Sequence, residues 1–207
     1  MKVQARALIE AAAGRKLNVM FPMIAEPWEF DQAKAVYEHQ RAYLQSQKKR
    51  LPSQIRYGAM LEVPALAECL DLMADRLDFL SIGTNDLTQF LFAADRSNPK
   101  LAERFDWMSP AILRFLSRAS ENAARFDIML SVCGEMGGRP LDALTLLGLG
   151  IRSLSITPAS VGPIKAMVRS LDLGQAKQEV EAILKEAPAD ARARLEQWAT
   201  RHKVDLG

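Results

Sequence analysis

Short apolar runs alternate with longer amphipathic segments along the chain, and this alternation restricts the possible folds more than any other feature. The near-continuous hydrophobicity of the runs is typical of strands buried on both faces of a sheet. One intervening segment starts with Ser109 as a cap and Pro110 at its first position, and then carries an apolar stripe at helical spacing. The pattern predicts strands that alternate with helices. The expected strands cover residues 17–24, 55–62, 79–85, 128–133 and 153–157.

Strands linked by helices form parallel sheets, in either a doubly wound fold or a (β/α)8 barrel. No run is followed by the G-x-G-x-x-G spacing of doubly wound dinucleotide-binding proteins, because Gly148 and Gly150 precede a run. A barrel is therefore favoured, but a complete one takes roughly 250 residues and eight strands. We expect a single α/β domain over residues 1–207, a partial TIM (β/α)8 barrel of about five parallel strands with C-terminal helices over 175–203.

The composition excludes several classes of partner. Hydrophobic residues make up 49% and charged residues 25% of the chain, as in a soluble globular protein. The net charge of +2 is spread along the sequence, so no basic surface for nucleic acid or for an anionic membrane is predicted. Every apolar run is shorter than the roughly 20 residues that cross a bilayer, and the first residues contain no apolar leader. We expect a cytoplasmic protein.

Reactive side chains stand at the ends of three expected strands. Glu62 ends the second run, Asn85 and Asp86 follow the third, and Cys133 ends the fourth. In a barrel these ends face one mouth, where catalytic groups lie. Two carboxylates there repel each other unless a proton or a cation neutralises them. Mg²⁺ fits, because one or two carboxylates commonly bind it while water and substrate oxygens complete its shell. Glu62 and Asp86 are thus predicted to bind Mg²⁺ and an anionic substrate.

The two carboxylates also have structural interpretations. Asp86 could cap a helix that begins near Leu87, and Glu62 could stabilise a helix start through its charge. On the residues alone, both interpretations stay open.

For Cys133, Cys69 and Arg96, too, we weigh a structural interpretation against a functional one. Cys133 could be a nucleophile, a proton donor or an inert small hydrophobe, and we expect Cys69 to belong to the core. Arg96 could hold a phosphate or a carboxylate from a loop over the mouth, or it could pair with Asp95 at the surface.

Longer motifs surround these residues. They read Met-Phe-Pro-Met-Ile at 20–24, Gly-Ala-Met-Leu-Glu-Val-Pro at 58–64, Ser-Ile-Gly-Thr-Asn-Asp-Leu-Thr-Gln-Phe at 81–90, Ala-Ala-Asp-Arg at 93–96, Met-Ser-Pro at 108–110 and Cys-Gly-Glu-Met at 133–136. In content and order they resemble enzyme I of the bacterial phosphotransferase system, a phosphoenolpyruvate-protein phosphotransferase. The resemblance runs from about Ala5 to Leu173.

This resemblance implies a role for each predicted residue. Glu62 and Asp86 would hold Mg²⁺, Asn85 and Arg96 would contact phosphoenolpyruvate alongside Asp86, and Cys133 would be the general acid that protonates C3 of the enolate as pyruvate forms. The phosphoryl group would pass to a histidine on another domain and onward to a histidine phosphocarrier protein. Since the motif around that histidine is missing here, we do not expect the isolated chain to be active alone. The family also implies a homodimer.

Some residues depart from this pattern. Gly137 and Gly138 are closer to pyruvate phosphate dikinases and phosphoenolpyruvate synthases, which share the barrel. The segment Ser-Val-Gly-Pro-Ile-Lys at 160–165 is closer to the protein phosphotransferases, and the nitrogen-regulatory branch is nearer than the sugar branch. A dikinase or synthase barrel and a catalytically incompetent, dimerising fragment remain the alternatives.

Overall fold

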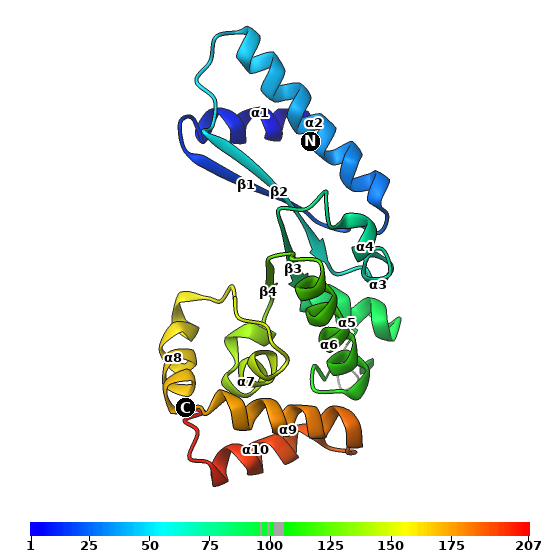
Figure 1. Ribbon diagram of the computed structural model, residues 1–207, viewed down its shortest axis with the longest axis vertical. Coiled ribbons are helices and arrows are strands. Elements are labelled where there is room, and N and C mark those ends of the chain that lie inside the picture. Colours follow the sequence, from blue (N-terminus) through cyan, green and yellow to red (C-terminus); the bar gives the residue numbers. More distant parts are fainter. Residues whose placement is uncertain (96, 99, 102–105) are drawn as a thin grey trace.

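The structure is a computed structural model that describes residues 1–95, 97–98, 100–101 and 106–207. Figure 1 shows an elongated molecule with its first two helices at one end and its last two at the other. None of the described helices is both long and apolar enough to span a bilayer. In chain order the elements are α1 (Lys2–Ala11), β1 (Lys16–Phe21), α2 (Pro27–Ser46), β2 (Gln54–Leu61), α3 (Pro64–Ala67), α4 (Leu70–Met73), β3 (Phe79–Gly83), α5 (Thr84–Phe92), α6 (Pro110–Arg125), β4 (Leu130–Cys133), η2 (Met136–Gly138), α7 (Pro140–Gly148), η3 (Pro158–Ser160), α8 (Val161–Ser170), α9 (Leu173–Glu186) and α10 (Ala191–Arg201).

The sheet formed by the described residues has four parallel strands that pair in chain order, β1-β2-β3-β4. A doubly wound sheet reverses its strand order at a switch point, and this sheet does not. Right-handed crossovers between successive strands place the connecting helices on one side of the sheet. The α/β class is therefore confirmed, and the arrangement is that of part of a (β/α)8 barrel.

The fifth expected strand, at residues 153–157, is shorter than predicted. Only an isolated parallel bridge joins Val132 to Leu154 in the described chain. Val132 N donates to Ser153 O at 2.9 Å, and Ser155 N donates to Val132 O at 2.8 Å. Two features limit the pairing. The partner strand β4 ends just before Gly134, which has a φ of +106°, and Pro158 begins η3.

One face of the sheet packs against helices to form a first hydrophobic core. α2 starts cleanly because Pro27 occupies its first turn and Glu26 and Glu29 form a capping box. Because side chains alternate along a strand, Ser81 and Cys133 point to the opposite face, which is the inner face of a barrel. The strand residues that point into the core are Val19, Phe21, Tyr57, Ala59, Leu61, Leu80, Ile82 and Val132.

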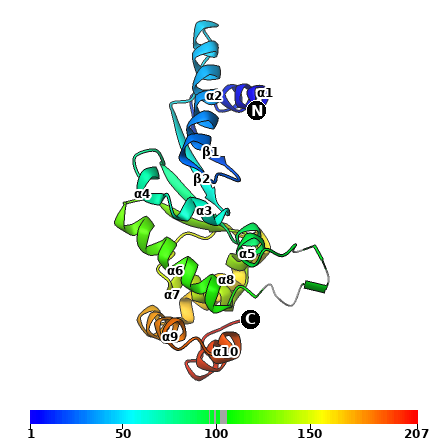
Figure 2. The same cartoon turned by 90° about the vertical axis from the view of Figure 1, so that its right-hand side faces the viewer.

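A second hydrophobic core joins the last four helices. Leu144 of α7, Met167 of α8, Ile183 of α9 and Leu195 of α10 are all buried in it. The C-terminal helices expected over 175–203 are α9 and α10, which Figures 1 and 2 show side by side. They are separated at Ala187, whose φ of +47° interrupts the helix.

Candidate active site at the carboxyl ends of the strands

The strand register brings the predicted site residues to one edge of the sheet. Leu61 of β2 pairs with Ile82 of β3, and Gly83 of β3 pairs with Cys133 of β4. Since the strands are parallel, the residues that follow them leave the sheet at the same edge. Glu62, the start of α5 and Cys133 therefore line a single rim.

The Glu62 carboxylate is held at the tips of three strands. The residue is only 2% exposed. Its Oε1 accepts a hydrogen bond of 2.7 Å from Met23 N, beyond the end of β1, where Met23 has a φ of +56°. Its Oε2 faces Gly83 of β3, so closely that a Cβ added there would lie 2.8 Å away. Glu62 is thus a fixed carboxylate, and it directly precedes Val63, the N-cap of α3.

Asp86 lies half-buried in the first turn of α5, three residues after Gly83, whose backbone Glu62 approaches. The helix begins earlier than expected, at Thr84, and Gly83 occupies the cap position. Asp86 is therefore not the cap residue, although its charge favours the positive end of the helix. Within the described ranges no cluster of three or more His, Cys, Asp or Glu side chains could hold a metal. A cation at Glu62 and Asp86 would need further oxygens from water and substrate, which is how Mg²⁺ is commonly bound.

Hydrogen bonds fasten the start of α5 to the end of β4. Asn85 Oδ1 accepts a long hydrogen bond of 3.5 Å from Glu135 N, and Thr84 Oγ1 donates to Cys133 O at 3.3 Å. A Cβ at Gly134 would lie 2.5 Å from Thr84 Oγ1, so this close approach requires glycine. Sequence reasoning missed Thr84 and Gly134. A glycine directly after a strand-end cysteine was the available signal, because glycine often marks a close backbone approach.

The two cysteines differ in setting. The Cys133 thiol is partly buried on the rim and donates to Ile82 O at 3.5 Å. Cys69 was expected to lie in one helical stretch and to belong to the hydrophobic core, which is wrong: the stretch breaks into α3 and α4, and Cys69 is the partly buried N-cap of α4. Burial raises the pKa of the Cys69 thiol, and the nearby carboxylates of Glu26, Asp71 and Glu68 raise it further.

A cleft of about 540 Å³ opens beside β4, on the same rim. Arg139 lies at its wall, with its guanidinium carbon 4.8 Å from the centre of the Trp107 ring and a nitrogen 3.8 Å from Glu135. Sequence reasoning did not single out this cleft. Arg96, the predicted substrate contact, lies outside the described residues. The cleft is lined by Gly134, Glu135, Gly138, Arg139, Ser155, Ile156, Thr157 and Ser160.

Comparison with known proteins identifies the class to which this fold and rim belong. Residues 1–173 match the family described as PEP-utilising enzyme, PEP-binding domain. The chain belongs to this family, and the resemblance drawn from the motifs is confirmed.

The curated relatives are phosphotransferases. The chain is 38% identical over 176 residues to a phosphoenolpyruvate-dependent phosphotransferase system protein of Salmonella typhimurium, covering 84% of this chain and 24% of that protein. It is 39% identical over 183 residues to the phosphoenolpyruvate-protein phosphotransferase of Geobacillus stearothermophilus, covering 88% and 32%. A multiphosphoryl transfer protein of Xanthomonas campestris is 39% identical over 185 residues, covering 89% and 21%. The chain therefore spans about a third or less of these relatives.

Among solved structures, a citrate lyase from Burkholderia xenovorans superposes with a TM-score of 0.56 at 18% sequence identity. The match covers 94% of this chain and 72% of that one. At this identity the likeness concerns the fold alone.

Proposed function

We propose that this chain is the phosphoenolpyruvate-binding part of a phosphoenolpyruvate-protein phosphotransferase. One observation carries the proposal: the buried Glu62 carboxylate at the strand tips beside the first turn of α5, in a member of the PEP-binding family. The phosphotransferase relatives, at 38% to 39% identity, support this reaction.

In the proposed site, Glu62 and Asp86 hold one Mg²⁺, while Asn85, Asp86 and Arg96 contact phosphoenolpyruvate. The bound cation supplies positive charge to the phosphate and carboxylate oxygens of the substrate. The donor set supports this assignment, because two carboxylates at one strand edge suit a hard cation that keeps positions for substrate. Glu62 would be a rigid ligand, because the hydrogen bond from Met23 N holds its Oε1 in place. Catalysis of phosphoryl transfer rests mainly on such positioning and neutralisation of charge.

Cys133 is the proton donor in the proposed reaction. Transfer breaks the bond between phosphorus and the enol oxygen, forms a bond from phosphorus to a histidine nitrogen on another domain, and leaves the enolate of pyruvate. The Cys133 thiol gives its proton to C3 of that enolate, and pyruvate results. The position of the Cys133 thiol supports this assignment, because it lies partly buried on the rim, with Sγ 3.5 Å from Ile82 O.

The partners of the whole protein are part of the same proposal. The histidine domain passes the phosphoryl group to a histidine phosphocarrier protein in the cytoplasm. The chain associates as a homodimer. Exposed apolar side chains near β1 support self-association, among them Met23 at 50% and Trp28 at 57% exposure.

Titration calorimetry tests the binding proposal directly. Phosphoenolpyruvate is titrated into the folded chain with Mg²⁺ and, separately, with EDTA. We expect binding only in the presence of Mg²⁺. If circular dichroism shows a folded chain and neither titration gives a heat of binding, the proposed function is wrong for this chain.

A further inference from the structure

The proposed proton donor and the proposed substrate ligands stand on different elements of the rim. Cys133 ends β4, whereas Asn85 and Asp86 lie in the first turn of α5. A proton passes readily from a thiol to a carbon only when the two reacting atoms are held roughly 3–3.5 Å apart. The proposed chemistry therefore depends on what holds the end of β4 against the start of α5.

A buried hydroxyl makes this connection. Thr84, the first residue of α5, is 1% exposed, and its Oγ1 donates to Cys133 O at 3.3 Å. A buried hydroxyl needs a hydrogen-bond partner, and Cys133 O is the acceptor that the described structure provides. The bond lies just beyond the last paired residues of the two strands, Gly83 and Cys133. It therefore extends the attachment of β4 to the start of the helix.

The backbone after Cys133 gives the strand end less support. Gly134 has a φ of +106°, a conformation that glycine adopts without steric cost. The next bond to α5 comes after this glycine, from Glu135 N to Asn85 Oδ1, and it is longer, at 3.5 Å. The bond from Thr84 is thus the shorter of the two side-chain hydrogen bonds between α5 and the end of β4. It is also the one that reaches the residue carrying the thiol.

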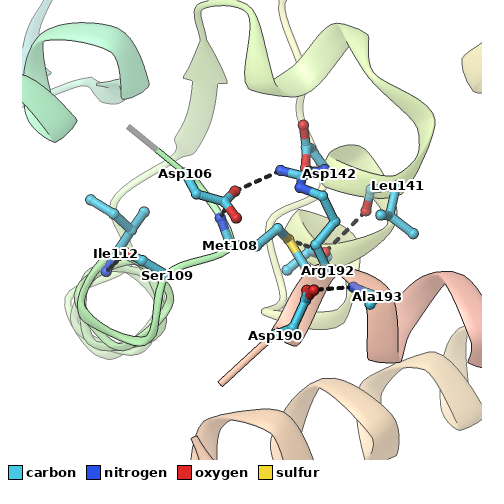
Figure 3. Close-up of polar contacts among 10 residues, drawn as sticks. Asp106, Met108, Ser109, Ile112, Leu141, Asp142, Asp190, Arg192 and Ala193 are labelled. Atoms are coloured by element: carbon cyan, nitrogen blue, oxygen red, sulfur yellow. Dashed lines mark hydrogen bonds and ion pairs between the residues drawn. The ribbon is translucent and has the colours of Figure 1, made fainter. Parts of the chain in front are cut away.

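The helix that follows the rim is held from another direction. Asp142, in the first turn of α7, is 0% exposed, and its Oδ1 lies 2.9 Å from Nη1 of Arg192 in α10. Nη2 of Arg192 lies 2.8 Å from Oδ1 of Asp106, before α6 (Figure 3). These two ion pairs fasten α7 to α10 and to Asp106, and neither of them involves Cys133 or α5. The described contacts therefore fix the thiol from the side of β3 and α5.

We propose that Thr84 is a positioning residue for the proton-transfer step, acting through the carbonyl of Cys133. Its hydroxyl keeps its own proton and fixes the distance between the Cys133 thiol and C3 of a substrate held at the first turn of α5. Thr84 itself touches neither the cation nor the substrate. This inference rests on the proposed function and on the role of Cys133 within it.

Proton exchange and substrate affinity, measured on the same variants, separate positioning from binding. In D₂O with Mg²⁺, proton NMR follows exchange of the methyl protons of pyruvate, the C3 protons that Cys133 would transfer. Thr84→Ala should lower the exchange rate about tenfold, because misplacing a reacting group by 1 Å can cost about a hundredfold. Its calorimetric affinity for phosphoenolpyruvate with Mg²⁺ should stay within about twofold of the parent chain, since the binding groups are kept. Thr84→Ser, which keeps the hydroxyl, should exchange within about twofold of the parent chain.

Thr88→Ala is the matched control. Thr88 is a threonine of the same helix with the same 1% exposure, but its Oγ1 donates to Thr84 O at 2.7 Å, within α5. Thr88→Ala should therefore exchange like the parent chain. Equal losses of exchange in Thr84→Ala and Thr84→Ser, or in Thr84→Ala and Thr88→Ala, at equal folded fraction would overturn the proposal. A loss of affinity in Thr84→Ala as large as its loss of exchange would overturn it as well.

Alkylation of the thiols by iodoacetamide, followed by mass spectrometry, separates this inference from the proposed function. Thr84→Ala should raise the alkylation rate of Cys133 about threefold or more, because a released thiol is more accessible. Cys69 in the same chain is the internal reference, and Thr84→Ser and Thr88→Ala should leave both rates unchanged. If the parent chain neither binds phosphoenolpyruvate nor exchanges, the proposed function fails, while selective alkylation of Cys133 in Thr84→Ala still supports the positioning. Unchanged alkylation of Cys133 in Thr84→Ala removes the inference whatever the exchange result.

Discussion

Glu62 is the side chain on which the metal proposal depends. Glu62→Gln keeps an oxygen that can accept from Met23 N and removes the charge, so the fold should persist while the cation loses a ligand. We expect the Mg²⁺-dependent affinity for phosphoenolpyruvate to fall about tenfold or more, within the range found when support for a metal site is removed. Calorimetry with and without Mg²⁺ measures the change. Glu135→Gln removes an exposed carboxylate from the same rim and should retain the affinity.

Cys133 can be tested without the histidine domain. In D₂O with Mg²⁺, a proton donor next to C3 should exchange the methyl protons of pyruvate, which proton NMR follows. Cys133→Ser should still bind phosphoenolpyruvate and lose exchange about a hundredfold, the lower range for general acid catalysis. Cys69→Ser, which removes the other thiol, should exchange like the parent chain. Equal rates for the two variants would contradict the role of Cys133.

The buried Asp142 makes the effect of Arg192 on stability depend on pH. Burial raises the pKa of Asp142, while Arg192 and then Arg139 lower it and Asp106 raises it. A carboxyl with a raised pKa in the folded state stabilises the fold below the unfolded pKa of about 3.9, and this contribution is lost as pH rises through the folded pKa. Removing Arg192 raises the folded pKa further, so the loss of stability grows with pH.

Urea denaturation at pH 5 and pH 8 measures this dependence. Arg192→Met should destabilise the fold by about 3–5 kcal/mol at pH 8, as when one partner of a buried ion pair is removed. The destabilisation should be smaller at pH 5, where Asp142 can take up a proton. The same destabilisation at both pH values would show that Asp142 is not responsible.

The close contact between the end of β4 and the start of α5 depends on Gly134. An alanine there would have to adopt a φ of +106° and place its Cβ 2.5 Å from Thr84 Oγ1. We expect Gly134→Ala to lower the free energy of unfolding by about 1–3 kcal/mol and to weaken phosphoenolpyruvate binding through displacement of Asn85. Urea denaturation and calorimetry provide the measurements. Gly162→Ala in α8 meets no atom within 4 Å and should change stability by less than about 0.5 kcal/mol.

Strands and helices with strong local signals were predictable from the sequence. The apolar runs indicated β1 to β4, and Ser109 with Pro110 indicated the start of α6. The strand at 153–157 was overestimated, because its extent depends on the length of its partner β4. The break between α3 and α4 was missed, since the stretch is apolar at helical spacing throughout.

Two hydrophobic cores hold the molecule together, one on the sheet and one among α7 to α10. Leu195 of α10 is fully buried in the second core. Leu195→Ala should destabilise the chain by about 2–5 kcal/mol, because a cavity remains where the side chain packed. Denaturation in urea gives the value, and Leu72→Ala is the control, since Leu72 is 59% exposed. A loss of less than about 1 kcal/mol for Leu195→Ala would show that the second core adds little to stability.

The general architecture could be predicted from the sequence, but the long-range contacts between side chains could not. Parallel strands in chain order bring consecutive strand ends together, so the meeting of Glu62, Asn85 and Cys133 at one edge could be derived from their positions alone. Met23, which donates to Glu62, has a left-handed backbone conformation. No sequence pattern predicts that conformation, so the contact could not be predicted. Arg192 was missed because its partners, Asp106 and Asp142, are far from it in sequence.

The ion pair of Arg192 with Asp142 also bears on the order in which the chain folds. Strands that pair with their neighbours in sequence can join the sheet as they leave the ribosome, whereas α10 follows all four strands and α7 in the chain. Until α10 docks, Asp142 lacks the ion pair with Arg192 and keeps only the charge of Arg139 to favour its ionised form, so its early burial is more costly. Completion of the second core therefore waits for α10.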